Sequence, residues 1–139
     1  MIRYAVKSDL ESMYKLIRQL SSHEFSKEQF DECYLYNLEK GRVLIYEKDN
    51  VTCGCLVFNI HYHLHFSQKS AEIVNLIVDD SCRSRGIGKE LLVFFEQIAI
   101  DNNCVCIEVD SGKHREDAHR FYEREGFIAT HHKFTKELL

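Results

Sequence analysis

Apolar residues recur along this chain with two different periods, one typical of helices and one typical of strands. Ser8-Asp9-Leu10-Glu11 and Ser26-Lys27-Glu28-Gln29 each match a capping box, in which the serine caps a helix and the fourth side chain reaches back. Apolar residues at helical spacing follow both segments. Helices are therefore expected from Leu10 to Leu20, from Ser26 to near Gly41, from Ile87 to Asp101 and from about Arg115 to Glu125.

Runs with strand-like composition lie between these helices. They predict strands at 2–6, 43–47, 51–65, 71–78, 104–109 and about 131–135, with Gly54 marking a bulge or a bend. The helix after residue 78 is expected to bury Leu91, Leu92, Phe94, Phe95, Ile98 and Ala99. The predicted order is β-α-α-β-β-β-α-β-α-β, without repeat or linker, which indicates a single domain over residues 1–139.

The overall composition is that of a soluble globular protein. The 139 residues are 45% hydrophobic and 29% charged, and 18 basic against 22 acidic side chains give a net charge of −4. This balance argues against nucleic acid as a partner, because binding a phosphate backbone requires a dense basic surface. The first residues do not form a signal peptide, and no apolar run has membrane-spanning length. We therefore expect a cytoplasmic protein without a membrane partner, whose six cysteines are reduced thiols.

The segment from Val78 to Lys89 is a basic, glycine-containing loop between a predicted strand and a predicted helix. Gly86 and Gly88 allow the backbone to approach a ligand closely, and a helix start presents N–H groups to an anion. The loop does not match the dinucleotide pattern of three glycines, nor the nucleotide P-loop, because Glu90 follows Lys89. It predicts a site for a phosphorylated cofactor.

Arg83, Gly86 and Gly88 match Arg-x-x-Gly-x-Gly, and this resembles the pyrophosphate loop of the GNAT superfamily of acyl-CoA N-acyltransferases. The segment from Ala118 to Phe127 resembles the Ala-x-x-Phe-Tyr-x-x-x-Gly-Phe segment of the same superfamily. The resemblance spans nearly the whole chain. It implies an α/β (α+β) fold with a central mixed, mostly antiparallel sheet flanked by about four helices.

The resemblance also implies acetyl-CoA as cosubstrate. The backbone N–H groups from Arg85 to Lys89 would hold its pyrophosphate, and the backbone at Ile77 and Val78 would pair with its pantetheine arm. The residues expected to bind the cofactor are Ile77, Val78, Arg83, Arg85, Gly86, Ile87, Gly88 and Lys89.

Two side chains are candidates for catalysis by direct transfer to a primary amine. As the resemblance implies, Tyr122 would protonate the departing thiolate and Glu72 would deprotonate the amine, directly or through water. Alternation places Glu72 on one strand face with Val74, Leu76 and Val78. The plainer alternatives are a core aromatic for Tyr122 and a solvated strand-end carboxylate for Glu72.

The cysteines suggest two competing chemistries, covalent catalysis and zinc binding. Cys82 lies beside the loop, but no pattern places a histidine-activated thiol against a substrate, so direct transfer is preferred. Cys53/Cys55 and Cys104/Cys106 are spaced for one strand face, whereas zinc sites favour Cys-x₂₋₄-Cys on turns. Buried structural cysteines are therefore the favoured interpretation.

His61, His63 and His65 are spaced to share one face of a strand. Such a face could bind a divalent metal, bind an anionic group or be a hydrated surface. The segments around Tyr62–His65, Ala71–Ile73, Arg115–Tyr122 and Phe134–Lys136 resemble bacterial aminoalkylphosphonate N-acetyltransferases, most strongly from His61 onward. That resemblance implies an aminophosphonate acceptor and an activity supported by a divalent metal.

The three histidines and Arg115, with Lys113, are the candidates for binding the acceptor. Arg115 stands where many GNAT members have asparagine, which removes a cofactor contact or gives this position to the acceptor. Two alternatives are open: acetylation of another amine, such as a polyamine, an aminoglycoside or a protein N-terminus, and a non-catalytic acyl-CoA-binding regulatory module. A homodimer is expected only by analogy with the superfamily.

Overall fold

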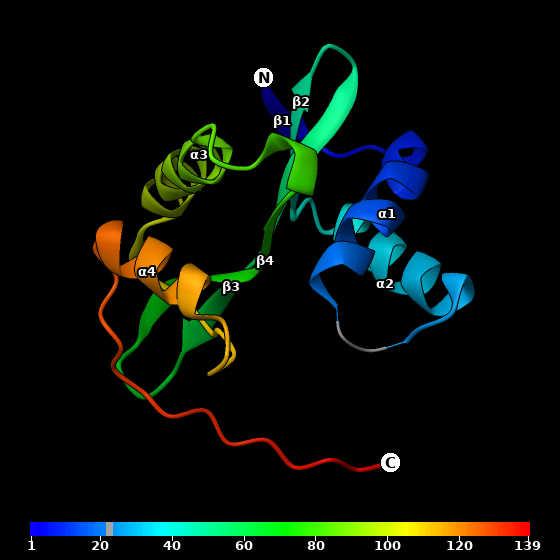
Figure 1. Ribbon diagram of the computed structural model, residues 1–139. Coiled ribbons are helices and arrows are strands. Elements are labelled where there is room, and N and C mark those ends of the chain that lie inside the picture. The colour runs from blue at the N-terminus through cyan, green and yellow to red at the C-terminus, as the bar shows by residue number, and fades with distance from the viewer. Residues whose placement is uncertain (22–23) are drawn as a thin grey trace. The chain divides into compact units, whose positions relative to one another are not determined.

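The computed structural model describes residues 1–21 and 24–139, which form two compact units, Met1–Glu108 and Val109–Leu139 (Figure 1). The first unit holds β1 (Ile2–Tyr4), α1 (Leu10–Leu20), α2 (Lys27–Glu39), β2 (Val43–Lys48), β3 (Val51–His63), β4 (Gln68–Val78), α3 (Ile87–Asp101) and β5 (Cys104–Val109). Val109, the last residue of β5, is counted with the second unit. Two short 3₁₀ helices, η1 (Lys7–Asp9) and η2 (Asp80–Cys82), precede α1 and α3. The second unit holds α4 (Glu116–Arg124). No helix among the described residues is long and apolar enough to cross a membrane.

The five strands form one sheet in the order β1-β2-β3-β4-β5. The pairs β1/β2, β2/β3 and β3/β4 are antiparallel. β4 and β5 are joined through α3, which is the crossover that parallel neighbours need. The predicted mixed, mostly antiparallel sheet with four helices is therefore confirmed.

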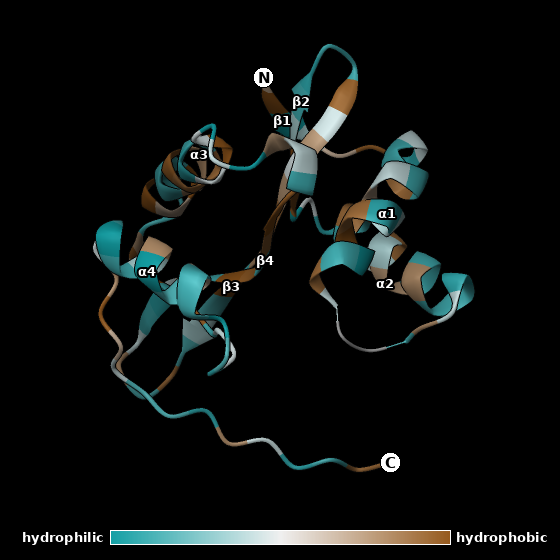
Figure 2. Cartoon of the chain, in the orientation of Figure 1, coloured by the Kyte–Doolittle hydropathy of each residue, from teal (hydrophilic) through white to brown (hydrophobic). Residues whose placement is uncertain are grey.

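The first unit has a core on each face of the sheet (Figure 1). Side chains of α1 and α2 pack on one face against Val43, Ile45, Cys55, Val57 and Ile77. On the other face α3 buries Leu91, Leu92 and Phe95, whose ring centroid lies 4.8 Å from that of Phe58. Phe94 and Ile98 were expected to be buried as well, but Phe94 is 38% exposed and Ile98 is only half-buried. Figure 2 shows more hydrophobic residues along α3 than along α4.

Two bulges interrupt the ladders of β3. Tyr46 pairs with Gly54 and Glu47 with Thr52, so Cys53 is an extra residue, and the predicted irregularity at Gly54 is confirmed. A side chain at Gly54 would place its Cβ 3.0 Å from the Ile77 carbonyl oxygen and 3.2 Å from Ile87 Cγ2. Glycine at this position therefore allows the first turn of α3 to approach the sheet.

The second bulge lies between β3 and β4. Val57 pairs with Asn75 and Phe58 with Ile73, which leaves Val74 without a partner in this ladder. An extra residue reverses the alternation of side chains. The alternation read from residues 75–78 therefore cannot be continued through Val74 to predict the face of residues 70–73. This bulge decides which side chains share a face with Glu72.

The helix starts show one correct capping prediction and one wrong one. Ser26 Oγ accepts the N–H of Gln29 at 3.1 Å, and the Ser26 N–H donates to Gln29 Oε1 at 2.9 Å, as expected. Ser8 does not cap α1, because it lies inside η1 and α1 begins after Asp9. The Asp9 carboxylate instead accepts the Val6 N–H at 2.8 Å.

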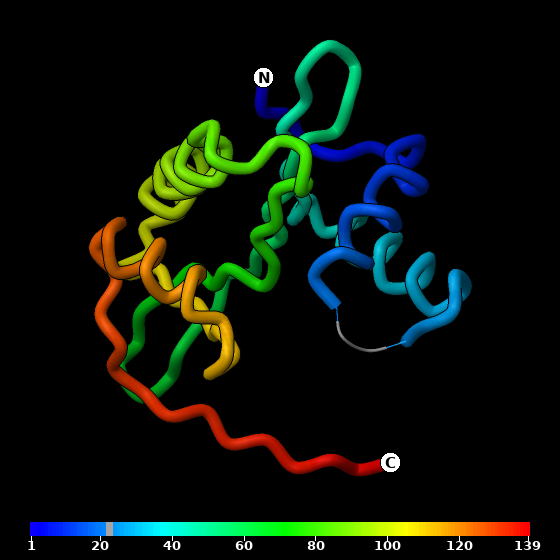
Figure 3. Tube along the Cα trace, viewed as in Figure 1, coloured from blue at the N-terminus to red at the C-terminus, as the bar shows by residue number. Residues whose placement is uncertain are grey.

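The strand expected at about 131–135 is absent from the structure, in which residues 127–139 form neither helix nor strand (Figure 3). Contacts there include the hydrogen bond from the Phe127 N–H to the Tyr122 carbonyl at 2.9 Å and the ion pair of Lys133 Nζ with Asp110 Oδ2 at 3.3 Å. A strand exists only where its backbone pairs with a neighbour, and residue alternation does not supply one. The strand prediction for 51–65 is too long, and β3 ends at His63.

A buried ion-pair network fixes the start of the chain. The Arg3 guanidinium donates to both oxygens of Asp9 at 2.9 Å and to Glu47 Oε2 at 2.6 Å. Asp9 is only 8% exposed, and the hydrogen bonds from Arg3 lower the pKa of its carboxyl group. β1, η1 and β2 are therefore joined by one carboxylate–guanidinium cluster.

We predict that Asp9→Asn lowers the free energy of unfolding at pH 7 by about 1–3 kcal/mol, since it breaks a charged, buried hydrogen-bond set. The pKa of Asp9 is lower in the folded than in the unfolded chain, so its contribution is complete above the ordinary aspartate range. The contribution is lost as the pH falls through the lowered pKa. Urea unfolding from pH 7 to pH 3 should show the difference between wild type and variant shrinking in acid. Glu39→Gln, at an exposed carboxylate, is the control and should change stability by less than about 0.5 kcal/mol.

Candidate functional site

The basic loop leads directly from β4 into α3. Gly86 caps α3 with a φ of +76°, a left-handed conformation that glycine adopts without steric cost. The first hydrogen bond of the helix joins the Glu90 N–H to the Gly86 carbonyl at 3.0 Å. The N–H groups of the preceding residues, Ile87 and Gly88, belong to the first turn, which in an α-helix has no intrahelical acceptors. The helix start therefore has the geometry of an anion site.

Asp79 anchors the entrance of this loop. Its N–H donates to the Cys53 carbonyl at 2.8 Å, and its Oδ1 accepts the Ser81 N–H at 2.9 Å. Gln19 of α1 donates from Nε2 to Asp79 Oδ2 at 3.0 Å. Hydrogen bonds from Ser81 and then Gln19 lower the pKa of the Asp79 carboxyl group. Sequence reasoning missed both Gln19 and Asp79, because the contact joins residues that are far apart along the chain.

The residues predicted to bind the cofactor differ in their surroundings. Arg83, Arg85, Gly86 and Lys89 are exposed, whereas Ile77 and Ile87 are each 4% exposed. Arg83 forms an ion pair with Asp80 at 2.9 Å. The buried isoleucines fix the loop to the sheet, and the exposed residues leave its outer side accessible to a ligand.

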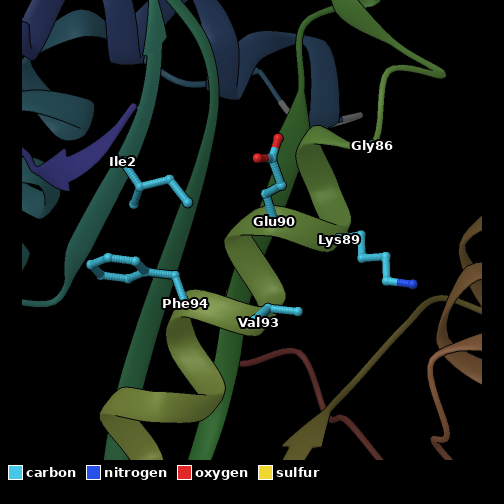
Figure 4. A pocket seen from close by; sticks show the side chains of 6 residues that line it. All are labelled: Ile2, Gly86, Lys89, Glu90, Val93 and Phe94. Carbon is cyan, nitrogen blue, oxygen red and sulfur yellow. The ribbon is translucent and has the colours of Figure 1, made fainter.

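A hollow of about 390 Å³ lies beside the start of α3 (Figure 4). It is lined by Ile2, Gly86, Lys89, Glu90, Val93 and Phe94. Ile2 and Phe94 face the space between strand and helix, whereas Lys89 points away from it. A second hollow of about 320 Å³ includes Phe58, Ile60 and Tyr62. Neither hollow is lined by Glu72 or by the candidate histidines.

A polar surface, here called the histidine face, consists of Asn59, His61 and His63 of β3 and Ser70 and Glu72 of β4. Asn59 pairs with Glu72 and His61 with Ser70, and paired residues project on the same side of a sheet. His61 Nε2 lies 2.8 Å from Glu72 Oε1. His63 Nε2 lies 2.7 Å from the Ser70 hydroxyl. The two predicted kinds of residue, the carboxylate and the histidines, therefore meet on one face.

The predicted neighbours of Glu72 on its strand are wrong. Alternation was expected to place it with Val74, Leu76 and Val78, but the bulge at Val74 reverses the pattern. Leu76 and Val78 pair with Leu56 and Gly54, on the other side of the sheet. Glu72 instead shares its face with the histidines, and its side chain is 25% exposed.

Ser70 and Glu108 extend the histidine face to β5. The Ser70 hydroxyl donates to Glu108 Oε1 at 3.3 Å, so it is the acceptor for the His63 Nε2–H. Ser70 is only 1% exposed. Sequence reasoning missed both residues. The available signal was a serine two positions before Glu72, in a strand where a polar side chain at a buried position needs a partner.

His65 does not lie on the strand with the other two histidines. β3 ends at His63, and His65 is in the turn that follows, with its ring centroid 5.5 Å from that of His63 and 4.4 Å from that of Phe66. Among residues 1–21 and 24–139, no group of three or more His, Cys, Asp or Glu side chains is arranged to hold a metal ion. The histidine face therefore does not form a complete metal site from its own side chains.

Arg115 and Tyr122 lie in the second unit. Tyr122 of α4 is 8% exposed, and its ring centroid lies 5.4 Å from those of Phe121 and Phe127. Burial raises the pKa of the Tyr122 hydroxyl, and the positive charge of Arg115 acts in the opposite direction. Arg115 caps α4, and its N–H donates to the Gly112 carbonyl at 3.0 Å. Tyr122 is thus a buried aromatic that keeps its proton in neutral solution, which suits both a core residue and a general acid.

All six cysteines are free thiols, and Cys53, Cys55 and Cys82 are buried. Cys104 is half-buried and Cys106 is exposed, so the expectation of buried cysteines is wrong for Cys106. Cys55 is fully buried, and burial raises the pKa of its thiol to about 12. Burial also raises the pKa of Cys53, as does its hydrogen bond with Cys82. Raised pKa values disfavour the thiolate, so Cys53 and Cys55 have the surroundings of structural cysteines.

Comparison with known proteins identifies the family to which this chain belongs. The model of the Acetyltransferase (GNAT) family matches residues 10–127. An aminoalkylphosphonate N-acetyltransferase of Salmonella typhimurium (strain LT2) is 32% identical over 139 residues, which cover 99% of this chain and 90% of that protein.

Solved structures agree on the fold. A transcriptional regulator from Bacillus halodurans C-125 matches with a TM-score of 0.88 and 23% identity over 99% of each chain. The aminoglycoside N-acetyltransferase AAC(6')-Iy in complex with CoA matches with a TM-score of 0.87 and 19% identity, over 100% of this chain and 95% of that one. At these identities the two likenesses establish the fold alone. The family match over most of the chain, together with the relative that aligns along nearly all of it, assigns this chain to the Acetyltransferase (GNAT) family as an acetyl-CoA-dependent N-acetyltransferase.

Proposed function

We propose that this enzyme acetylates the primary amine of small aminoalkylphosphonates. The observation that carries this proposal is the 32% identity, along 99% of the chain, to a protein of that name. The histidine face supports it, because imidazole N–H groups can donate hydrogen bonds to a doubly anionic phosphonate. Arg115 supports it further, since its positive charge suits such an anion and also acts to lower the pKa of the Tyr122 hydroxyl, the proposed general acid.

The loop from Arg83 to Lys89 holds the pyrophosphate of acetyl-CoA in this proposal. The left-handed Gly86 and the first turn of α3 support it, because they direct N–H groups toward an anion. The backbone of Ile77 and Val78 pairs with the pantetheine arm. Arg83 and Arg85 add positive charge at the exposed side of the loop.

The chemistry is a direct transfer. The acceptor arrives as an ammonium ion and must lose a proton before its nitrogen can attack the thioester carbon. The negative charge of Glu72 favours removal of this proton from the ammonium group. The new C–N bond forms and the C–S bond breaks. The Tyr122 hydroxyl donates its proton to the departing thiolate, and the second proton that the nitrogen loses restores the Tyr122 hydroxyl through solvent. The raised pKa of Tyr122 supports this role, since the group remains protonated until the thiolate appears.

The acceptor is tested by measuring thiol release from acetyl-CoA with 2-aminoethylphosphonate, with and without a divalent cation, and with spermidine as the control amine. We expect kcat/KM to be at least about tenfold higher for the phosphonate, a preference of about 1.4 kcal/mol. Preference for spermidine would contradict the phosphonate proposal and leave the acetyltransferase in place. A rate that depends on the cation would support the divalent-metal requirement that the family resemblance implies.

The loop is tested by Gly86→Ala. Alanine at a φ of +76° is strained, so the helix start shifts and acetyl-CoA is predicted to bind about 5- to 10-fold more weakly. Gly41→Ala is the matched control, because Gly41 has a φ of +67° and no atom within 4 Å of an added Cβ. It imposes a similar strain away from the loop. Calorimetric titration with acetyl-CoA should therefore separate the two variants, and equal affinities would argue against the loop.

The general acid is tested by Tyr122→Phe, which removes the hydroxyl and keeps the ring packing. We expect kcat to fall by about 10²-fold while the affinity for acetyl-CoA stays within about twofold of wild type. Phe121→Leu, a change of the neighbouring aromatic residue, controls for disturbed packing. Full turnover in Tyr122→Phe would assign Tyr122 to the core.

A further inference from the structure

The contact between His61 and Glu72 bears on the identity of the base, and this inference depends on the proposed acetyl transfer. His61 Nε2 and Glu72 Oε1 are 2.8 Å apart. An ionised carboxylate only accepts hydrogen bonds, so the proton between these atoms belongs to Nε2. In the neutral imidazole the lone pair is then on Nδ1.

The imidazole is the better placed of the two groups to take a proton near neutral pH. An imidazole changes charge close to neutrality, whereas an ordinary carboxyl group does so several pH units lower. A carboxylate behind the imidazole fixes its tautomer and stabilises the imidazolium that forms. The His61–Glu72 pair has this arrangement, with 41% of the His61 side chain exposed to receive a substrate.

We propose that His61 is the catalytic base and that Glu72 is its positioning residue. Nδ1 of His61 takes one proton from the ammonium group of the acceptor, and the freed electron pair of the nitrogen attacks the thioester carbon. The N–H bond of the ammonium breaks and an Nδ1–H bond forms. The imidazolium later releases this proton to solvent, and no group is oxidised or reduced.

His63 has a different environment although it lies on the same face. Its Nε2 contacts the neutral hydroxyl of Ser70 at 2.7 Å, and the carboxylate of Glu108 follows only beyond that hydroxyl. His61 contacts a carboxylate directly. On the described histidine face this direct pairing distinguishes His61 from His63, which stays a candidate for binding the phosphonate.

Other charged groups surround the pair and remain unchanged when either member is substituted. The His63 ring centroid lies 6.1 Å from that of His61, and Glu108 is linked to His63 through Ser70. Arg42 donates to Asn59 Oδ1 at 2.6 Å, beside Glu72 on the same face. Their influence is common to the wild type and the variants, so a change between the pH profiles reports on His61 and Glu72.

The test is the pH dependence of kcat/KM for the wild type, His61→Gln and Glu72→Gln, with 2-aminoethylphosphonate or whichever amine the wild type accepts. In His61→Gln the base is lost, so kcat/KM at pH 7 should fall by about 10²–10⁴-fold. Its acid limb should move to higher pH, because only free amine reacts. In Glu72→Gln the imidazole remains as the base but loses the carboxylate that fixes its tautomer, so kcat/KM should fall without the shift of the acid limb to higher pH that His61→Gln shows.

The opposite pattern overturns the assignment. If Glu72 acts alone, Glu72→Gln moves the limb to higher pH, and His61→Gln leaves it near the wild-type position. His132→Gln, at an exposed histidine outside the histidine face, is the control, and its acid limb should stay in place.

Failure of the assignment and failure of the proposed function look different in this experiment. A wild type that turns over an amine, with an unmoved limb in His61→Gln, refutes the role of His61 alone. A wild type that binds acetyl-CoA and transfers acetyl to no amine refutes the enzymatic proposal and the base together. Melting temperatures of the three variants within a few degrees of wild type show that the fold is intact.

Discussion

The antiparallel ladder between β3 and β4 is the interaction on which both parts of the first unit's site depend. At one end Gly54 pairs with Val78, directly before the basic loop, and at the other end His63 pairs with Gln68. The same set of backbone hydrogen bonds therefore fixes the start of the basic loop and the histidine face. A shift of register by one residue would send every side chain to the opposite face. The bulge at Val74 is such a shift within the ladder, and it brings Glu72 to the side of His61.

The two ends of this ladder differ in the kind of residue that they place at the site. Near the loop, two key positions are glycine: Gly54 lets Ile87 approach the sheet, and Gly86 takes a left-handed conformation. Near the hairpin, polar side chains are paired: His61 with Glu72, and His63 with Ser70 and Glu108. An anion needs backbone N–H groups at close range, whereas proton transfer needs side chains in a fixed tautomer.

The sequence predicted the elements and the loop well, because both depend on local signals. Helical spacing, the Ser26 capping box and the glycines of the loop all act within a few residues of one another. The bulge at Val74, the contact of Gln19 with Asp79 and the link from Ser70 to Glu108 join distant residues, so no local pattern contains them. The wrong face for Glu72 and the missing strand at 131–135 have this same cause. Alternation describes a chain that is able to form a strand, but pairing decides where one forms and which way its side chains point.

The role proposed for Glu72 depends on a contact between two strands, which no local sequence signal contains. Read along the chain, a glutamate among apolar residues looks like an isolated carboxylate base. Across the strands it is half of a pair, because its Oε1 is 2.8 Å from an imidazole nitrogen. This contact fixes the tautomer of the imidazole, with the proton on Nε2 and the lone pair on Nδ1. In the proposed mechanism, proton acceptance at the histidine face is a property of two side chains on neighbouring strands, and neither residue type alone indicates which atom receives the proton.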